Sequence, residues 1–330
     1  MGKMKALLSG VVAAALVLGL AACRDTNDRT SKSTSPINTS SNKQTVKIAY
    51  LPIVHALPLF VENEISTQNL KDINIELVKF GSWPELMDAL NTGRVDGASV
   101  LIELAMKAKE QGIDLNAVAL GHRDGNAVVV SSDINKTEDL KGKTFAIPSK
   151  LSTHNILLYQ MLKNAGLKLT DLKVVELPPA EMPAALSEGR ISGYIVAEPF
   201  GAKSVANGKG KVLYQAADLW KNSVCCGLVL SGDFIKNNSS AAQELVTEYV
   251  KAGNYIDLNT EKVNDIAKKY MNVEQNVLDL SLKWVTYKDL RLNENDYNDL
   301  SRYLIEMDLS KNPPSYKDFV DNSFINQAQK

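Results

Sequence analysis

Residues 89–97, ALNTGRVDG, return as residues 185–193, ALSEGRISG, after a shift of 96 positions. The two stretches share Ala-Leu, Gly-Arg and a final Gly at the same spacing. At the same shift the Leu-Pro pair at 51–52 falls on the Ile-Pro pair at 147–148. A short motif of this kind is part of the common vocabulary of α/β turns, but the matched order of elements around it favours an internal duplication.

Each copy has the pattern strand, helix, strand, helix, strand. Apolar or β-branched runs of strand length alternate with amphipathic runs of helical length. The expected elements are 46–51, 55–64, 75–80, 84–92 and 96–100 in the first copy, and 144–147, 153–165, 172–177, 181–188 and 193–196 in the second. This alternation predicts two parallel sheets covered by helices, with ligands gathered at the carboxyl ends of the strands. Two such lobes face to face would enclose a cleft.

A second match, at a shift of 100, pairs AVVVSSDI at 127–134 with GLVLSGDF at 227–234. Two similar extended segments that flank the second copy predict the two hinge segments of a two-lobed protein. On this interpretation lobe 1 comprises residues 44–127 and 231–330, and lobe 2 comprises residues 132–226. Helices expected over 241–258 and 277–284 would pack against lobe 1.

The N-terminus is typical of a bacterial lipoprotein signal peptide over residues 1–22. Lys3 and Lys5 precede an apolar run that is too short for a membrane span, and Leu-Ala-Ala-Cys at 20–23 forms a lipobox. Cleavage before Cys23 would leave its thiol carrying diacylglycerol, so the chain would be anchored to the membrane. A secretory signal that ends near a cysteine by chance is the alternative. Residues 23–43 would form the lipidated end and a polar, flexible tether on the extracytoplasmic face of the cell membrane.

Composition excludes several classes of function. The formal net charge is −1, which argues against a strongly basic surface and hence against a nucleic-acid partner. The chain has three cysteines, and two of them, Cys225 and Cys226, are neighbours that cannot join distant parts of the fold. Zinc-type ligand spacing, a phosphate loop and a nucleophile elbow are all missing from the sequence. A monomeric binding protein without catalytic residues or a cofactor is expected.

Four stretches carry a family resemblance: KIAYLPIVHALPLFV at 47–61, FGSWPELMDALNTGRVDGASV at 80–100, DLKGKTFAIPS at 139–149 and AEPFGAKSVANGKGKV at 197–212. Together they resemble the nitrate, sulfonate and taurine type of ABC-importer solute-binding protein, a family that includes binders of thiamine-pyrimidine precursors. The resemblance implies a two-lobed periplasmic-binding-protein fold of the second type. It also implies a small-molecule ligand, delivered by lobe closure to an ABC permease and its ATPase.

Loops at the ends of strands supply the candidate ligand-binding residues. They are Pro52, His55, Ser82, Trp83 and Leu101 in the first lobe, Ser149, Ser152, Thr153, His154 and Glu198 in the second, and Cys225 and Cys226 at the return to the first. Ser152 and Thr153 either cap a helix or bind an anion. The Trp83 ring either stacks on the ligand or lies in the core. His55 has the same ambiguity between ligand contact and a cap or surface role.

The Cys225-Cys226 pair has three interpretations: buried apolar cysteines, a vicinal disulfide, or a soft pair of sulfurs that touches the ligand. The last interpretation suits a thiophilic metal or an organometal and gives the alternative to a sulfonate-, nitrate-, taurine- or pyrimidine-like ligand. An enzyme resembling the thiamine-pyrimidine synthases, which carry a cysteine-rich motif and a reactive histidine, is a further rival. A signalling or adhesion lipoprotein would instead fill the cleft with its own side chains.

Overall fold

The computed structural model describes residues 43–221, 223–258 and 260–329. The expected signal peptide, the lipidated Cys23 and all of the expected tether except Lys43 lie outside these residues. Within the described ranges, every helix is too short or too polar to cross a membrane.

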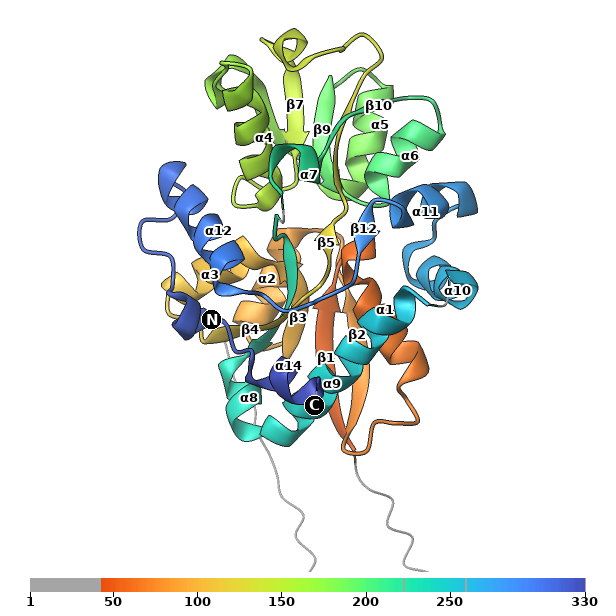
Figure 1. Cartoon of the computed structure of the whole chain (residues 1–330), viewed down its shortest axis with the longest axis vertical. Coiled ribbons are helices and arrows are strands. Elements are labelled where there is room, and N and C mark those ends of the chain that lie inside the picture. Colours follow the sequence, from red (N-terminus) through yellow and green to blue (C-terminus); the bar gives the residue numbers. More distant parts are fainter. Residues whose placement is uncertain (1–42, 222, 259, 330) are drawn as a thin grey trace, which may run out of the picture. The chain divides into compact units, whose positions relative to one another are not determined.

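Two sheets form the framework (Figure 1). Each has five strands, and the two sheets have the same strand order. The first sheet runs β2-β1-β3-β11-β4, with bounds β1 (Gln44–Tyr50), β2 (Ile73–Lys79), β3 (Gly97–Leu101), β4 (Leu115–Leu120) and β11 (Cys226–Ser231). The second runs β8-β7-β9-β6-β10, with bounds β6 (Asn126–Val130), β7 (Thr144–Ile147), β8 (Lys173–Glu176), β9 (Gly193–Ala197) and β10 (Lys211–Gln215). In each sheet three parallel strands are followed by one that runs antiparallel to them, β11 or β6. The sequence repeat is therefore a structural repeat.

Glycines that match in the repeat have matching physical roles. Gly93 and Gly189 both have a φ of +70°, the left-handed conformation in which helices commonly end. Gly97 and Gly193 open the third strand of each copy, where a Cβ atom would lie 2.5 Å and 2.8 Å from a neighbouring side chain. The motif is repeated because each copy needs a helix stop and then a strand without a side chain at its first residue.

Helices cover both sheets, as parallel strands require. Around the first sheet and in the C-terminal region lie α1 (Leu57–Ile65), α2 (Trp83–Asn91), α3 (Ile102–Glu110), α8 (Gly232–Asn237), α9 (Ser239–Ile256), α10 (Thr260–Met271), α11 (Gln275–Leu282), α12 (Glu294–Glu306), α13 (Tyr316–Phe319) and α14 (Ser323–Ala328). Around the second lie α4 (Thr153–Asn164), α5 (Met182–Ser187), α6 (Phe200–Ala206) and α7 (Ala216–Leu219) (Figure 1). Single 3-10 turns are η1 (Val54–Ala56), η2 (Thr137–Leu140), η3 (Leu169–Asp171) and η4 (Pro179–Glu181). Strands β3, β6 and β9 are buried along their whole length.

The two segments predicted as hinges are strands of the sheets in the structure. The run expected at 127–134 is mostly β6, which pairs with β9 and β10 inside the second sheet, and the run at 227–234 is mostly β11, which pairs with β3 and β4 inside the first. Both runs are β-branched or apolar strands with neighbours on each side, so they are sheet strands and the links between the sheets precede them. The first link contains the short strand β5 (Arg123–Asp124), which pairs with β12 (Val285–Thr286). We call the two sheets with their helices lobe 1 and lobe 2.

Candidate functional site

Strand ends bring together every histidine of the chain and both cysteines of the described residues. The sequence has three histidines. His55 follows β1 in η1, His122 follows β4, and His154 lies in the first turn of α4 after β7. Because β11 is antiparallel to β3, Cys225 and Cys226 at its start lie at the edge where β3 ends. All five side chains are at most 1 % exposed.

Four of these residues form a close cluster. His55, His122, Cys225 and Cys226 each offer one donor atom within 4.8 Å of the others. The two sulfurs are 3.8 Å apart, and Nδ1 of His55 lies 3.6 Å from Sγ of Cys226 and 3.8 Å from Sγ of Cys225. A tetrahedral ion with bonds of about 2.3 Å to sulfur and about 2.1 Å to nitrogen places two sulfurs about 3.8 Å apart and a sulfur and a nitrogen about 3.6 Å apart. The three donors of His55 and the cysteines have the spacing of such a shell.

A hydrogen bond orients the His55 ring. Its Nε2 lies 2.9 Å from the carbonyl oxygen of Gly125. A carbonyl can only accept, so Nε2 carries the proton and Nδ1 presents its lone pair to both sulfurs. Gly125 has a φ of +77°, and a Cβ there would lie 3.2 Å from Nε2 of His55, so this position requires glycine.

The pKa values of the two thiols differ because each thiol affects the other inside the buried cluster. Burial alone would raise the pKa of the Cys225 thiol, but Cys226, His154, His122 and His55 hold it well below its usual value. Burial and the neighbouring Cys225 raise the pKa of Cys226 well above the usual value. The pair therefore gives up one proton easily and retains the second, which a bound cation would displace.

The other two imidazoles are neutral. Burial, with a contribution from His55, lowers the pKa of both His122 and His154 to about 4, against an opposing effect of Cys225. Neither ring nitrogen of His154 has a hydrogen-bonding partner among the described residues, whereas the His122 ring contacts the Cys225 thiol and the backbone of Asp124. Neutral imidazole is the form that binds metals, and a buried ring without partners has donor capacity to spare.

Thr153 fastens the first turn of α4 to lobe 1. Its hydroxyl is in hydrogen-bond contact with the carbonyl oxygen of Val224 and with the carboxyl of Glu103 on α3. The hydroxyl has one proton and the carbonyl can only accept, so the second contact needs a protonated Glu103. Burial supplies this condition, because it raises the pKa of Glu103 well above its usual value.

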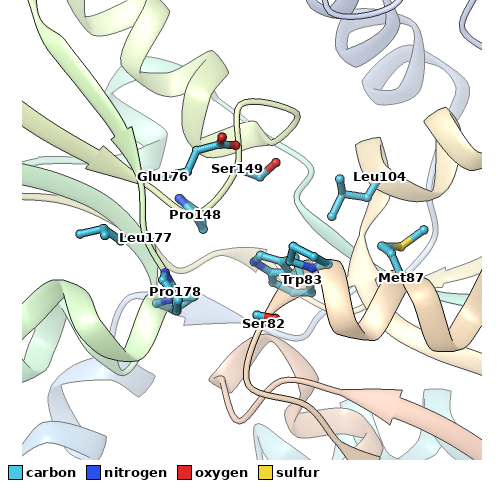
Figure 2. Close-up of a pocket in the computed structure, with 11 residues that line it drawn as sticks. Ser82, Trp83, Met87, Leu104, Pro148, Ser149, Glu176, Leu177 and Pro178 are labelled. Carbon is cyan, nitrogen blue, oxygen red and sulfur yellow. The ribbon is translucent and has the colours of Figure 1, made fainter.

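A separate cavity of about 320 Å³ lies between residues of the two lobes (Figure 2). Trp83, Met87 and Leu104 come to it from α2 and α3, and Ser149 and Glu176 come from the ends of β7 and β8. The complete lining is Ser82, Trp83, Pro84, Met87, Leu104, Pro148, Ser149, Glu176, Leu177, Pro178 and Pro179. This lining is mostly apolar and contains no lysine, arginine or histidine. Three predicted residues, Ser82, Trp83 and Ser149, thus meet in one cavity, apart from the cluster.

The remaining predicted residues have other surroundings. Pro52 lines a second cavity, of about 490 Å³, with Phe80 and Phe200. Leu101 ends β3 opposite Cys226 and is fully buried. Ser152 caps α4 by accepting from the backbone N–H of Asn155 at 3.3 Å, so the cap interpretation describes its contact.

Glu198 is fully buried at the end of β9. Its carboxyl accepts from the backbone N–H of Ala202 at 2.8 Å and from the hydroxyl of Ser281 on α11 at 3.2 Å. Burial raises the pKa of Glu198 to about 8 in spite of these two donors. Glu198 thus has one hydrogen-bonding partner on α6 and one on α11.

His122 is not among the residues that the sequence patterns selected, and the structure gives its neighbour Arg123 a different role from ligand binding. Arg123 pairs with Asp296 at 3.0 Å rather than with Asp124. A usable signal was present: the chain has few histidines, and each one follows a strand.

The comparisons with known proteins agree with this fold. The model of the NMT1-like family matches residues 39–271. The chain belongs to the NMT1-like family. A relative, the putative aliphatic sulfonates-binding protein of Escherichia coli (strain K12), is 28 % identical to this NMT1-like chain over 193 residues, which are 57 % of this chain and 60 % of the relative. The chain thus matches about three fifths of that relative's length.

Solved structures extend the likeness over most of the NMT1-like chain. The ligand-binding component of an ABC-type import system from Staphylococcus aureus with zinc bound has a TM-score of 0.82 and 40 % identity, covering 87 % of this chain and 99 % of its own. The periplasmic nitrate-binding protein NrtA from Synechocystis PCC 6803 has a TM-score of 0.78 and 17 % identity, covering 87 % and 88 %. These findings confirm the predicted family resemblance and the predicted two-lobed α/β fold.

Proposed function

We propose that this NMT1-like protein is the solute-binding component of an ABC importer and that its solute is a divalent thiophilic metal ion, held by His55, Cys225, Cys226 and a further imidazole. The observation that carries the proposal is the buried cluster, in which Nδ1 of His55 and the two sulfurs have tetrahedral spacing. His122 is the imidazole nearest to these three donors.

Charge selects the class of ion. Two thiolates neutralise a divalent cation, so a site whose residues are at most 1 % exposed carries no net charge when both thiol protons are displaced. An uncompensated buried charge costs several kcal/mol or more, so the neutral combination is favoured. Two sulfurs with two imidazoles form a ligand set preferred by Zn²⁺. The zinc-bound relative from Staphylococcus aureus supports this choice.

The anionic and pyrimidine ligands of the sequence prediction remain the second candidate, with the cavity beside Trp83 as their site. The unpartnered indole N–H of Trp83 and the hydroxyl of Ser149 are donors that such a ligand would use. A sulfonate or nitrate ion would find no cationic side chain among the residues lining that cavity, and Glu176 would repel it. The metal proposal is therefore preferred.

A receptor fits the cluster better than an enzyme does. Catalytic zinc sites keep one coordination position open for water or substrate, whereas two sulfurs and two imidazoles close the shell. The protein would carry the ion on the extracytoplasmic face, anchored through a lipid on Cys23, and present it as a monomer to the permease and ATPase of an importer.

The test is a titration of the reduced, metal-free protein with Zn²⁺, followed by thermal unfolding. A ligand that binds only the native state adds about 2.7 kcal/mol of stability at 100 times its dissociation constant. We expect Zn²⁺ to raise the unfolding midpoint, and the double variant Cys225→Ser, Cys226→Ser to lose more than about 100-fold in affinity.

Trp83→Ala serves as the matched control and should bind Zn²⁺ like the wild type. A panel of taurine, alkanesulfonates, nitrate and thiamine pyrimidines is measured in parallel. A midpoint that rises with one of these compounds, falls back in Trp83→Ala and ignores Zn²⁺ would overturn the metal proposal in favour of the cavity.

A further inference from the structure

The fourth donor of the proposed site must direct a lone pair at the ion as well as lie close to it. The rings of His55 and His122 are stacked, with centroids 3.4 Å apart and planes inclined by 23°. The lone pair of an imidazole nitrogen lies in the plane of its ring, so the lone pairs of two stacked rings lie in two separate, nearly parallel planes. An ion bound in the plane of His55 would therefore lie well out of the plane of His122.

The His154 ring has neither the stacking partner of His122 nor its contacts with Cys225 and the Asp124 backbone. The side chain is 1 % exposed and both ring nitrogens lack a hydrogen-bonding partner among the described residues. A buried polar group without a partner costs the folded state free energy, which calls for an explanation such as an ion.

The backbone holds His154 close to the cysteines. Thr153 contacts the carbonyl oxygen of Val224, and the next residues along the two segments are His154 and Cys225. One hydrogen bond thus fixes the turn that carries the histidine against the segment that carries the thiol.

We propose that His154, rather than His122, supplies the fourth donor, so that lobe 1 provides His55, Cys225 and Cys226 and lobe 2 completes the shell. This inference rests on the proposed function. His154 lies outside the group of four donors within 4.8 Å of one another, so its nitrogen must approach the ion by a movement of α4 toward lobe 1. The ion would then be bound by both lobes, with His122 supporting the His55 ring by stacking.

The experiment compares His154→Leu with His122→Leu, two substitutions of a buried histidine by an apolar side chain. Zn²⁺ affinity is measured by competition with a chelator under reducing conditions, and Co²⁺ replaces Zn²⁺ to report donor geometry in its visible spectrum. We expect His154→Leu to lose about tenfold or more in affinity and to change the Co²⁺ spectrum. His122→Leu removes only the stacking support of the His55 ring, so it should lose less affinity than His154→Leu and keep the wild-type Co²⁺ spectrum.

Metal-free stability separates coordination from folding. Removal of an unpartnered buried polar group is neutral or stabilising, so metal-free His154→Leu should unfold at or above the wild-type temperature while gaining less from Zn²⁺. A second control, Tyr159→Phe, removes the hydroxyl contact between α4 and Glu306 on α12 far along the same helix. Loss of affinity in Tyr159→Phe equal to that in His154→Leu would show a general effect of the α4 contact and would overturn the proposal.

Different results would overturn the proposed function and the assignment of His154. Wild-type protein that does not bind Zn²⁺ would overturn the proposed function and this inference with it. Zn²⁺ binding that survives His154→Leu but is lost in His122→Leu would overturn only the assignment of His154 and would make His122 the fourth donor.

Discussion

One backbone carbonyl determines which nitrogen of the His55 ring carries the proton. The carbonyl oxygen of Gly125 accepts a hydrogen bond from the Nε2–H group of His55, and Nδ1 therefore presents its lone pair to the two sulfurs. Sequence reasoning selected His55, Cys225, Cys226 and His154 as candidates because each lies near the end of a strand. It did not predict that they meet, because their convergence depends on β11 being inserted between β3 and β4. The ring tautomer and the stacked His122 depend on side-chain directions that no sequence pattern encodes.

Glu198 makes stability depend on pH. Its pKa in the folded protein is raised to about 8, and an unfolded glutamate titrates near 4.3. Below the unfolded pKa both states hold the proton, so the favourable contribution is complete. As pH rises toward the folded pKa, the unfolded state releases its proton first and stability falls, by at most about 1.4 kcal/mol per pH unit.

We therefore expect Glu198→Gln, which is neutral at every pH, to lose part of this slope between pH 5 and pH 8 in urea unfolding experiments. The exposed Glu181→Gln is the control and should follow the wild type. Parallel curves for wild type and Glu198→Gln would show that Glu198 does not retain its proton in the folded protein.

At the scale of elements, the repeat predicted nearly every strand and helix of both copies within a few residues. The expected strand at 144–147 is β7 itself, and the helix expected at 153–165 is α4, which ends at Asn164. The hinge prediction failed for a physical reason. Runs such as Val-Val-Val at 128–130 are equally suited to a crossing segment and to a strand buried on both faces, and only the pairing partners distinguish these roles.

The repeated helix stops give a prediction at this scale. Gly93 and Gly189 share a φ of +70°, and no atom lies within 4 Å of the Cβ that alanine would add at either. The cost of alanine is then the left-handed backbone alone, about 1–2 kcal/mol at each site. We expect Gly93→Ala and Gly189→Ala to lower the free energy of unfolding by this amount, and their costs to add in the double variant.

Gly81→Ala is the control, because Gly81 has no positive φ and its Cβ would lie 3.9 Å from the nearest atom, in Glu85. Urea unfolding of the four variants measures the effect. Equal stabilities for Gly93→Ala and Gly81→Ala would contradict the assigned role of the left-handed backbone.

At the scale of the whole molecule, sequence predicted two lobes from one duplicated pattern and an anchor from the first residues. The two-lobed fold is confirmed, and the anchor stays a prediction because Cys23 lies outside the described residues. The ligand was the hardest part to predict. The resemblance implied a sulfonate-, nitrate-, taurine- or pyrimidine-like ligand, whereas the proposed metal site depends on side chains that only the fold brings together.

Anchoring is tested on the full chain in a bacterial host. We expect the wild type to fractionate with membranes and Cys23→Ala to appear in the soluble fraction or the medium, because one acylated cysteine supplies the attachment. Cys225→Ser is the control for loss of a thiol and should remain with the membranes. Retention of Cys23→Ala in the membrane fraction would contradict lipid attachment at this residue.

The discontinuity of lobe 1 also sets an order of assembly. Lobe 2 is one unbroken stretch of chain, whereas the first sheet lacks its fourth strand until β11 has emerged. His55 and Cys225 are 170 residues apart, so a growing or partly exported chain holds the imidazole long before the sulfurs. Domains fold as units while the chain emerges, and a contact this distant forms last. A receptor exported in the unfolded state would leave the cytoplasm without cargo, and its first ion would come from the medium that it is meant to sample.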